Sequence, residues 1–179
     1  MFIVGIIIIF LVGSFLHFLY EFSHHNKVVA IFAAVNESTW EHIKICMTPT
    51  FLWSIYEIST NGFNNNFLFA KTMCLLTMIL LIPALFYSYT YFTKKPYLIV
   101  DIICFFITVI CSQLVFKYTV NLNISNTLFY LSIFILIIEI LAYLSLTYKP
   151  FKNFLFIDPI THKYGLDGHS CFHLHEHKH

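Results

Sequence analysis

Residues 35–44, with the sequence VNESTWEHIK, form the densest group of potentially reactive side chains in this chain. Apolar runs flank them, from 28 to 34 and from 45 onward, so polar groups placed here need a reason. Other ionisable groups interrupt the apolar runs elsewhere, at positions such as 17 and 139. As acid, base or nucleophilic groups of an active site we consider four residues: His17, Glu21, Glu41 and Glu139.

Imidazole and carboxylate are also metal-ligand types that suit Zn, Fe or Mn. A divalent transition metal is therefore the one cofactor that these residues suggest, although the spacing within 35–44 is not that of an established metal motif. The predicted ligands are His17, Glu37, Glu41 and His42. Further polar residues that we expect near them are Ser14, Asn36, Ser38, Trp40, Lys44, Asp101 and Asp158.

Ser14 and His17 lie three residues apart and could suggest a nucleophile with its base. A serine hydrolase also needs a third group and an oxyanion hole. The sequence contains no G-x-S-x-G, P-loop or C-x-x-C motif that would supply an alternative. The serine-hydrolase hypothesis is therefore the weaker one.

The composition places these groups in a membrane protein. Hydrophobic residues make up 59% of the chain, charged residues only 11%, and the mean hydropathy is +0.77. Soluble domains carry roughly a quarter charged residues. The net charge is +1, and no basic stripe indicates nucleic-acid binding, so the lipid bilayer is the expected partner.

A membrane-spanning helix needs about 20 mostly apolar residues. Five segments meet this length, and they predict an all-α polytopic membrane helix bundle over 1–148, followed by a polar tail over 149–179. The segment near 28–38 is too short to span and predicts an interfacial or re-entrant element. Ser38 and Glu41 have the spacing of a capping box at the start of the second helix. The expected spans are 2–22, 39–58, 67–91, 97–116 and 127–146.

Lysines are distributed unequally between the two sides of such a bundle. The positive-inside bias then places the N-terminus outside, the C-terminal tail in the cytoplasm and the protein in the plasma membrane. Lys71 and Lys117 fall on the outer side. The inner side, after the first, third and fifth spans, receives Lys27, Lys94, Lys95, Lys149, Lys152, Lys163 and Lys178.

This topology brings ionisable residues from four spans into the inner half of the bilayer: His17, Glu21, Glu41, His42, Asp101 and Glu139. An acidic residue within a span costs about 2.5–3.5 kcal/mol on insertion scales, so such groups usually face a partner or a cavity. We therefore expect one convergent polar cluster. The alternative is that each group has an unrelated local role, such as a helix cap or an interfacial residue.

The tail contains two different patterns. Asp158-Pro159 and Gly165 indicate a defined turn, which we expect to fold back on the cytoplasmic mouth of the bundle. Beyond it, His169, His173, His175, His177 and His179 form a His-rich tract. Such tracts bind transition-metal ions by composition alone.

Three stretches resemble a family of small bacterial multi-pass membrane proteins of unknown function. They are GSxxHFxYE from Gly13, VNESxWEHxK from Val35 and DPITxKYG from Asp158. The resemblance covers almost the whole chain, and the second stretch is its most specific part. It implies class and topology without an activity, a cofactor or a partner, and the His-rich end lies outside its pattern.

Three functions remain open at this point. The first is a membrane-embedded enzyme that acts on a lipid-like substrate at the cytoplasmic leaflet. The second is a proton-coupled carrier or transporter component, in which Glu139 and His17 titrate; a homodimer would supply its missing half. The third is a scaffold or accessory subunit, in which the polar residues only fix helix packing.

Overall fold

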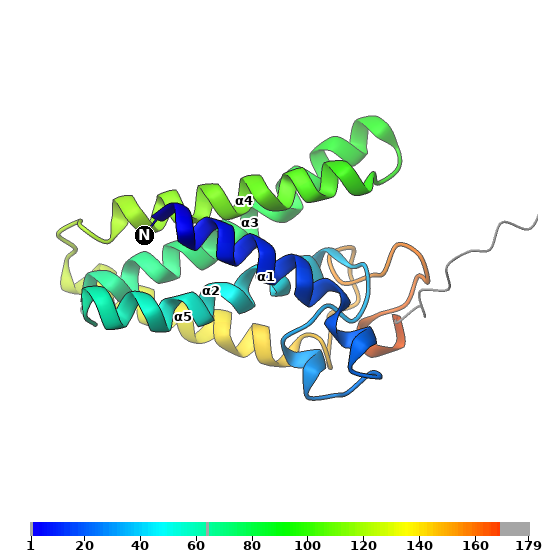
Figure 1. Cartoon of the computed structure of the whole chain (residues 1–179), viewed down its shortest axis with the longest axis horizontal. Helices are drawn as coiled ribbons and strands as arrows, with labels where there is room; N and C mark the ends of the chain where they lie inside the picture. The colour runs from blue at the N-terminus through cyan, green and yellow to red at the C-terminus, as the bar shows by residue number, and fades with distance from the viewer. Residues whose placement is uncertain (1, 64, 169–179) are drawn as a thin grey trace, which may run out of the picture.

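The computed structural model describes residues 2–63 and 65–168, and it confirms the all-α prediction. The described residues form five α-helices and two short 3-10 helices, without a β-strand (Figure 1). The α-helices are α1 Phe2–Phe22, α2 Thr39–Asn61, α3 Asn65–Thr93, α4 Leu98–Thr119 and α5 Asn126–Ser145. The 3-10 helices are η1 Val29–Ile31, within the segment expected to be too short to span, and η2 Gly165–Gly168.

Four of the five helices, α1, α3, α4 and α5, are long and apolar enough to cross a membrane. The prediction of a span over 39–58 is not matched by α2 on this measure, because α2 carries Glu41, Lys44 and Glu57. The N-terminal half of α2 lies inside the bundle, whereas Leu52 and Ile55 in its C-terminal half are exposed. Between Ser38 and Thr50 every residue except His42 is buried, so the charges of Glu41 and Lys44 are covered. Glu57, further along the helix, is also buried and pairs with Lys71 of α3.

Close contact between α1 and α2 depends on Gly13. A Cβ atom added at Gly13 would lie 2.9 Å from the carbonyl oxygen of Ile45 and 2.6 Å from Cζ of Phe105. The carbonyl of Ile45 lacks its usual helical donor because residue 49, four positions on, is proline and has no N–H. A glycine on α1 therefore fits where a proline in α2 has freed a backbone oxygen.

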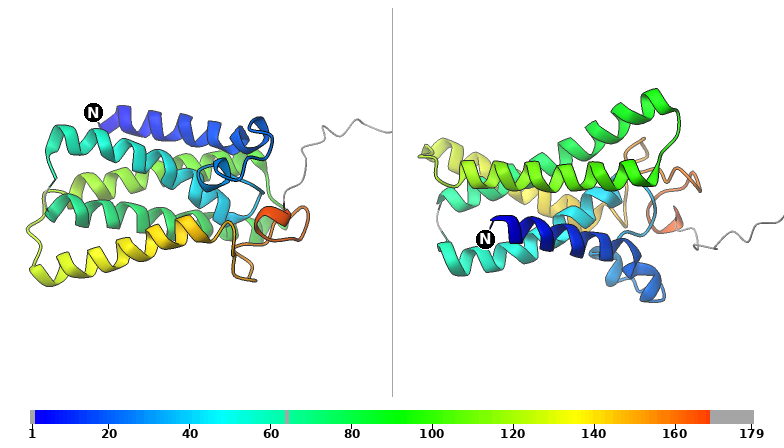
Figure 2. Two further views of the ribbon diagram at one scale, coloured as in Figure 1. Left: turned by 90° about the horizontal axis from the view of Figure 1, so that it is seen from below. Right: turned by 45° about the horizontal axis from the view of Figure 1, so that its top comes forward.

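The connections after α1, α3 and α5 lie at one end of the bundle, which we call the lysine-rich end (residues 23–38, 94–97 and 146–168). The α1–α2 connection and the chain after α5 lie side by side there, at the right of Figure 1, and Figure 2 shows the same from two other directions. The backbone N–H of Trp40 donates to the carbonyl of Leu155 at 3.0 Å, and the side-chain amide of Asn36 donates to the carbonyl of Gly165 at 2.8 Å. The expected fold-back of the turn from Asp158 to Gly165 is therefore present.

The start of α2 differs from the capping box expected there. Ser38 occupies the N-cap position, but its side chain makes no capping hydrogen bond. Its N–H donates instead to Oδ1 of Asn36 at 2.8 Å, while the Glu41 carboxylate accepts the N–H of Val35 at 3.0 Å. Glu41 does not reach back to Ser38 because Lys44, one turn further on, forms an ion pair with it at 2.5 Å.

Candidate functional site

Two histidines and one glutamate meet at the lysine-rich end. His17 comes from the penultimate turn of α1, Glu37 from the α1–α2 connection and His42 from the first turn of α2. Oε2 of Glu37 lies 3.4 Å from Nε2 of His17 and 3.8 Å from Nε2 of His42. All three ligand atoms lie within 4.8 Å of one another, and each side chain is half-buried. The structure thus brings together three of the four predicted metal ligands.

A pocket adjoins this cluster and has two kinds of wall. Glu37, His42 and Asp101 contribute ionisable groups, and the pocket has a cavity volume of about 30 Å³. Asp101, in the first turn of α4, accepts a hydrogen bond from the hydroxyl of Tyr89 on α3. The rest of the wall is formed by Thr39, Ile82, Phe86, Cys104 and Phe105. Acidic and basic groups therefore share a small pocket with mostly apolar side chains.

The two imidazoles determine the charge of Glu37. Burial by itself would raise the pKa of the Glu37 carboxyl. The hydrogen bond from His17, with the charges of His42 and His17, outweighs burial and holds that pKa below its usual value. Glu37 is therefore an anion between two potential cations, which is the state that a metal ligand or a general base needs.

The backbone around Glu37 is held by the chain that follows α5. Oδ1 of Asp158 accepts the N–H of Glu37 at 3.2 Å, and Oδ2 accepts the N–H of Thr161 at 2.8 Å. The Asp158 side chain is fully buried. Asn36 joins the same two segments, since it donates to Gly165 and accepts from Ser38. Residues 121 and 129 positions further along the chain thus fix the backbone position of Glu37.

Glu41, also predicted as a metal ligand and a catalytic group, belongs to a separate buried network. Its carboxylate binds Lys44 Nζ at 2.5 Å and accepts the hydroxyl of Thr147 at 2.9 Å. Lys44 Nζ donates in addition to Thr147 Oγ1 and to the carbonyl of Ala30, both at 2.7 Å. The side chains of Glu41 and Lys44 are 1% and 0% exposed. This network ties α2 to both neighbouring segments and offers no open face to a ligand.

Three other predicted residues lie apart from the cluster. The Ser14 hydroxyl donates to the carbonyl of Phe10 in its own helix at 2.8 Å, so it is not directed at His17. Glu21 is half-buried in the last turn of α1 and does not join the group of three ligand atoms. Glu139 is buried on the face of α5 that also contains Ser132 and Tyr143. Since α5 packs mainly on α3, while His17 lies on α1, the expected meeting of Glu139 with the cluster is not observed.

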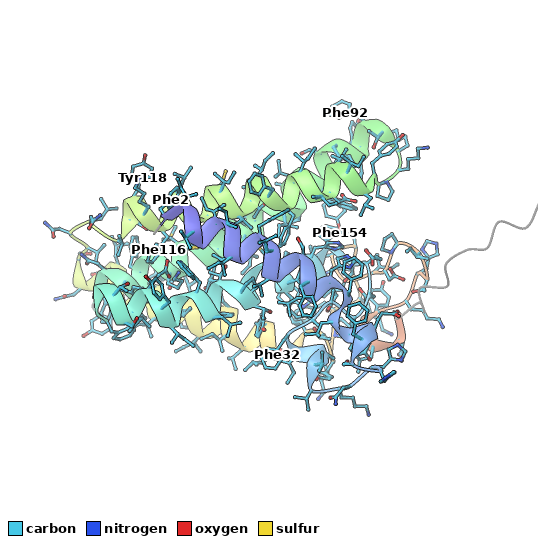
Figure 3. All side chains as sticks on the ribbon, in the orientation of Figure 1. Phe2, Phe32, Phe92, Phe116, Tyr118 and Phe154 are labelled. Carbon is cyan, nitrogen blue, oxygen red and sulfur yellow. The ribbon has the colours of Figure 1, made fainter. Side chains whose placement is uncertain are left out.

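The indole of Trp40 stabilises the other side of the α2 start. It is buried and its ring lies 5.3 Å from the ring of Phe156, centroid to centroid. Nearby, the hydroxyl of Tyr87 donates to the carbonyl of Phe154 at 3.0 Å and is hydrogen-bonded to Thr39 at 2.9 Å. Figure 3 labels Phe154 close to this end of the bundle. The chain after α5 therefore contacts both α2 and α3 beside the pocket.

Comparison with protein families matches residues 1–166 to a family of unknown function, DUF6512. The chain belongs to DUF6512. The match includes every member of the cluster, the pocket and the Glu41 network described above. Comparisons with curated proteins and with solved structures find no match.

The DUF6512 match ends before the His-rich tract, whose predicted metal binding lies outside the described residues. Sequence reasoning missed Thr147 and Tyr89, which complete the two polar groups of this DUF6512 chain. Thr147 is 103 positions from Lys44 and nothing around it in sequence indicates a partner. Tyr89 is one of several aromatic residues near the end of α3, so the sequence does not distinguish it from its neighbours.

Proposed function

We propose that this protein is a multi-pass, membrane-embedded enzyme that acts on a lipid-like substrate at its lysine-rich end. One observation carries the proposal: the pocket joins ionisable groups, Glu37, His42 and Asp101, to an apolar wall that includes Phe86 and Phe105. A substrate with a polar headgroup and an acyl chain presents the same two chemistries. In this proposal Glu37 and His42, which line the pocket, move protons at the headgroup, and His17 contacts Glu37.

The lysine distribution supports an orientation for this enzyme. Lys71 and Lys117 lie near the opposite end of the bundle, and the other described lysines outside the helices gather at the pocket's end. By the positive-inside bias this end faces the cytoplasm of a plasma membrane, with the N-terminus outside, if all five helices cross. The cytoplasmic lysines would be Lys27, Lys94, Lys95, Lys149, Lys152 and Lys163.

The proposal is tested by the lipid composition of cells that produce the protein. We expect the wild type to change the amount of at least one lipid class relative to cells with an empty vector, measured by mass spectrometry of extracted lipids. Glu37→Gln should remove this change, because an amide cannot act as a base. Asp167→Asn, an exposed carboxylate at the same end, is the matched control and should behave as the wild type. A Glu37→Gln profile equal to that of the wild type would refute the assignment.

A second candidate function, a proton-coupled carrier, rests on Glu139. Both carboxylate oxygens of this buried residue are without a hydrogen-bond partner among the described residues. An unpaired carboxylate inside a membrane helix is a common feature of proton pathways. Proteoliposomes with an internal pH indicator distinguish the two functions: a carrier gives solute-dependent proton flux that Glu139→Gln abolishes, and an enzyme gives none.

A further inference from the structure

We propose that His17, Glu37 and His42 bind one divalent transition-metal ion. The inference deepens the proposed function by giving its site a cofactor, and only the link to catalysis rests on that function. The three side chains come from α1, the α1–α2 connection and α2, so no single local feature explains why they converge. Two neutral imidazoles and one carboxylate form the ligand set of many Zn and non-haem Fe sites.

The distances between ligand atoms are close to those of a coordinated ion. Metal–ligand bonds of about 2.0–2.1 Å in a tetrahedron place neighbouring ligand atoms roughly 3.3–3.4 Å apart. The His17–Glu37 separation is 3.4 Å and the His42–Glu37 separation is 3.8 Å. Because the remaining pair is also within 4.8 Å, small side-chain rotations suffice to bring all three atoms onto one ion.

The ring of His42 is already oriented as a metal ligand would be. Its Nδ1 lies 3.0 Å from the carbonyl oxygen of Ser38, which can only accept, so Nδ1 carries the proton. In the neutral ring Nε2 then has a free lone pair, and it faces the carboxylate of Glu37. Two acceptors that face each other need a cation between them, either a proton on Nε2 or a metal ion. A hydrogen bond from the second nitrogen to a backbone carbonyl is also the usual support of metal-bound histidine.

The glutamate is supported in the same way. Asp158 accepts the N–H of Glu37, and Asn36 bridges to Gly165 and to the N–H of Ser38. These contacts fix the backbone on both sides of the ligand by groups that are themselves buried. A binding site needs such a rigid surround, because ligands that must be ordered by the ion itself weaken its affinity.

Three protein ligands leave a coordination position for water or substrate, which is the arrangement of catalytic zinc sites. Glu37 and His42 line the pocket, so this position is accessible from the space that Asp101 shares. The Tyr89 hydroxyl donates to Asp101 and fixes that carboxylate in the same pocket. The ion therefore has a route to the proposed substrate.

The experiment must separate this site from the His-rich tract. We use the full chain with His169, His173, His175, His177 and His179 all changed to Asn, purified in detergent and stripped with a chelator. Zn²⁺ is then added, excess is removed by size exclusion, and bound metal is measured by elemental mass spectrometry. Co²⁺ is used in parallel because its visible absorption spectrum reports coordination by nitrogen and oxygen ligands.

We expect one Zn²⁺ per chain in this tail-substituted protein. Glu37→Gln and His42→Gln should each weaken the affinity at least about 100-fold, since each removes one of three ligands. His24→Asn is the matched control and should have no effect: His24 is exposed, outside the cluster, and has φ 52°, which asparagine tolerates. The bound Co²⁺ should give the intense bands of a four- or five-coordinate ion.

A tail-substituted protein without bound Zn²⁺, or one whose Co²⁺ spectrum equals that of the aqueous ion, would overturn the inference. This result needs no site variant, so it stands even where Glu37→Gln impairs folding. Stoichiometric Zn²⁺ that both Glu37→Gln and His42→Gln retain would also overturn it. If the protein binds Zn²⁺ but the lipid profile of Glu37→Gln equals that of the wild type, the proposed enzyme function is refuted and the metal site stands. If Glu37→Gln abolishes the lipid change but the protein binds no Zn²⁺, the metal site is refuted and the enzyme function stands.

Discussion

Thr147 is the residue whose replacement best tests how the polar groups of this protein hold it together. Its hydroxyl donates to Glu41 at 2.9 Å and accepts from Lys44 at 2.7 Å, and the side chain is 1% exposed. Thr147→Val keeps the shape and removes both hydrogen bonds. Lys44 and Glu41 would then keep each other, with Ala30 and Val35 as their remaining backbone partners.

The cost follows from the charge on both partners. A hydrogen bond to a charged group contributes about 1.5–3 kcal/mol to stability, and the variant loses two. The additional apolar surface of valine offsets roughly 1 kcal/mol of this loss. We therefore expect a decrease of about 2–5 kcal/mol in the free energy of unfolding. For a chain of this length that corresponds to a fall in Tm of about 4–20 °C.

Thermal unfolding in detergent, followed by tryptophan fluorescence, measures this effect. The fluorescence is informative because Trp40 is buried next to the network. Thr147→Ser is the control: it keeps the hydroxyl and loses one methyl group, which costs about 1 kcal/mol. Equal Tm values for Thr147→Val and Thr147→Ser would show that the hydroxyl contributes nothing, and our reading of the network would be wrong.

Three further results are expected. Lys44→Met should lower stability by about 3–5 kcal/mol in the same assay because it leaves a buried carboxylate without its cation; a loss below 1 kcal/mol would contradict the burial of the pair. Asp158→Asn should weaken Zn²⁺ binding about 10–100-fold at unchanged stoichiometry, because it loosens the backbone of Glu37; titration with a competing chelator measures this, and an unchanged affinity would mean that Asp158 has no positioning role. Gly13→Ala should lower the Tm, since overpacking against Ile45 typically costs about 1–3 kcal/mol; an unchanged Tm would show that α1 can move away freely.

Much of the architecture follows from the sequence because long apolar runs can satisfy their backbone groups inside a membrane only as helices. The five expected segments correspond closely to α1–α5, and the capping signal at Ser38 marked the start of α2 correctly even though the capping bonds differ. The Asp158-Pro159 and Gly165 positions also indicated the turn that folds back on the bundle. The chemistry of residues 35–44 was visible as a polar stretch between apolar ones.

Sequence could not sort the polar residues into groups, since Glu37 and Glu41 are four positions apart and chemically identical. The tertiary structure separates them. Glu41 is buried in an ion pair with Lys44 and a hydrogen bond with Thr147, whereas Glu37 contacts His17 and His42. Helical depth placed Glu139 at the level of the cluster, but the packing of α5 on α3 directs it elsewhere. Local chemistry and periodicity determine which segments are helices. Which carboxylate is buried as an ion pair and which one remains available depends on contacts between residues more than a hundred positions apart, and only folding creates these.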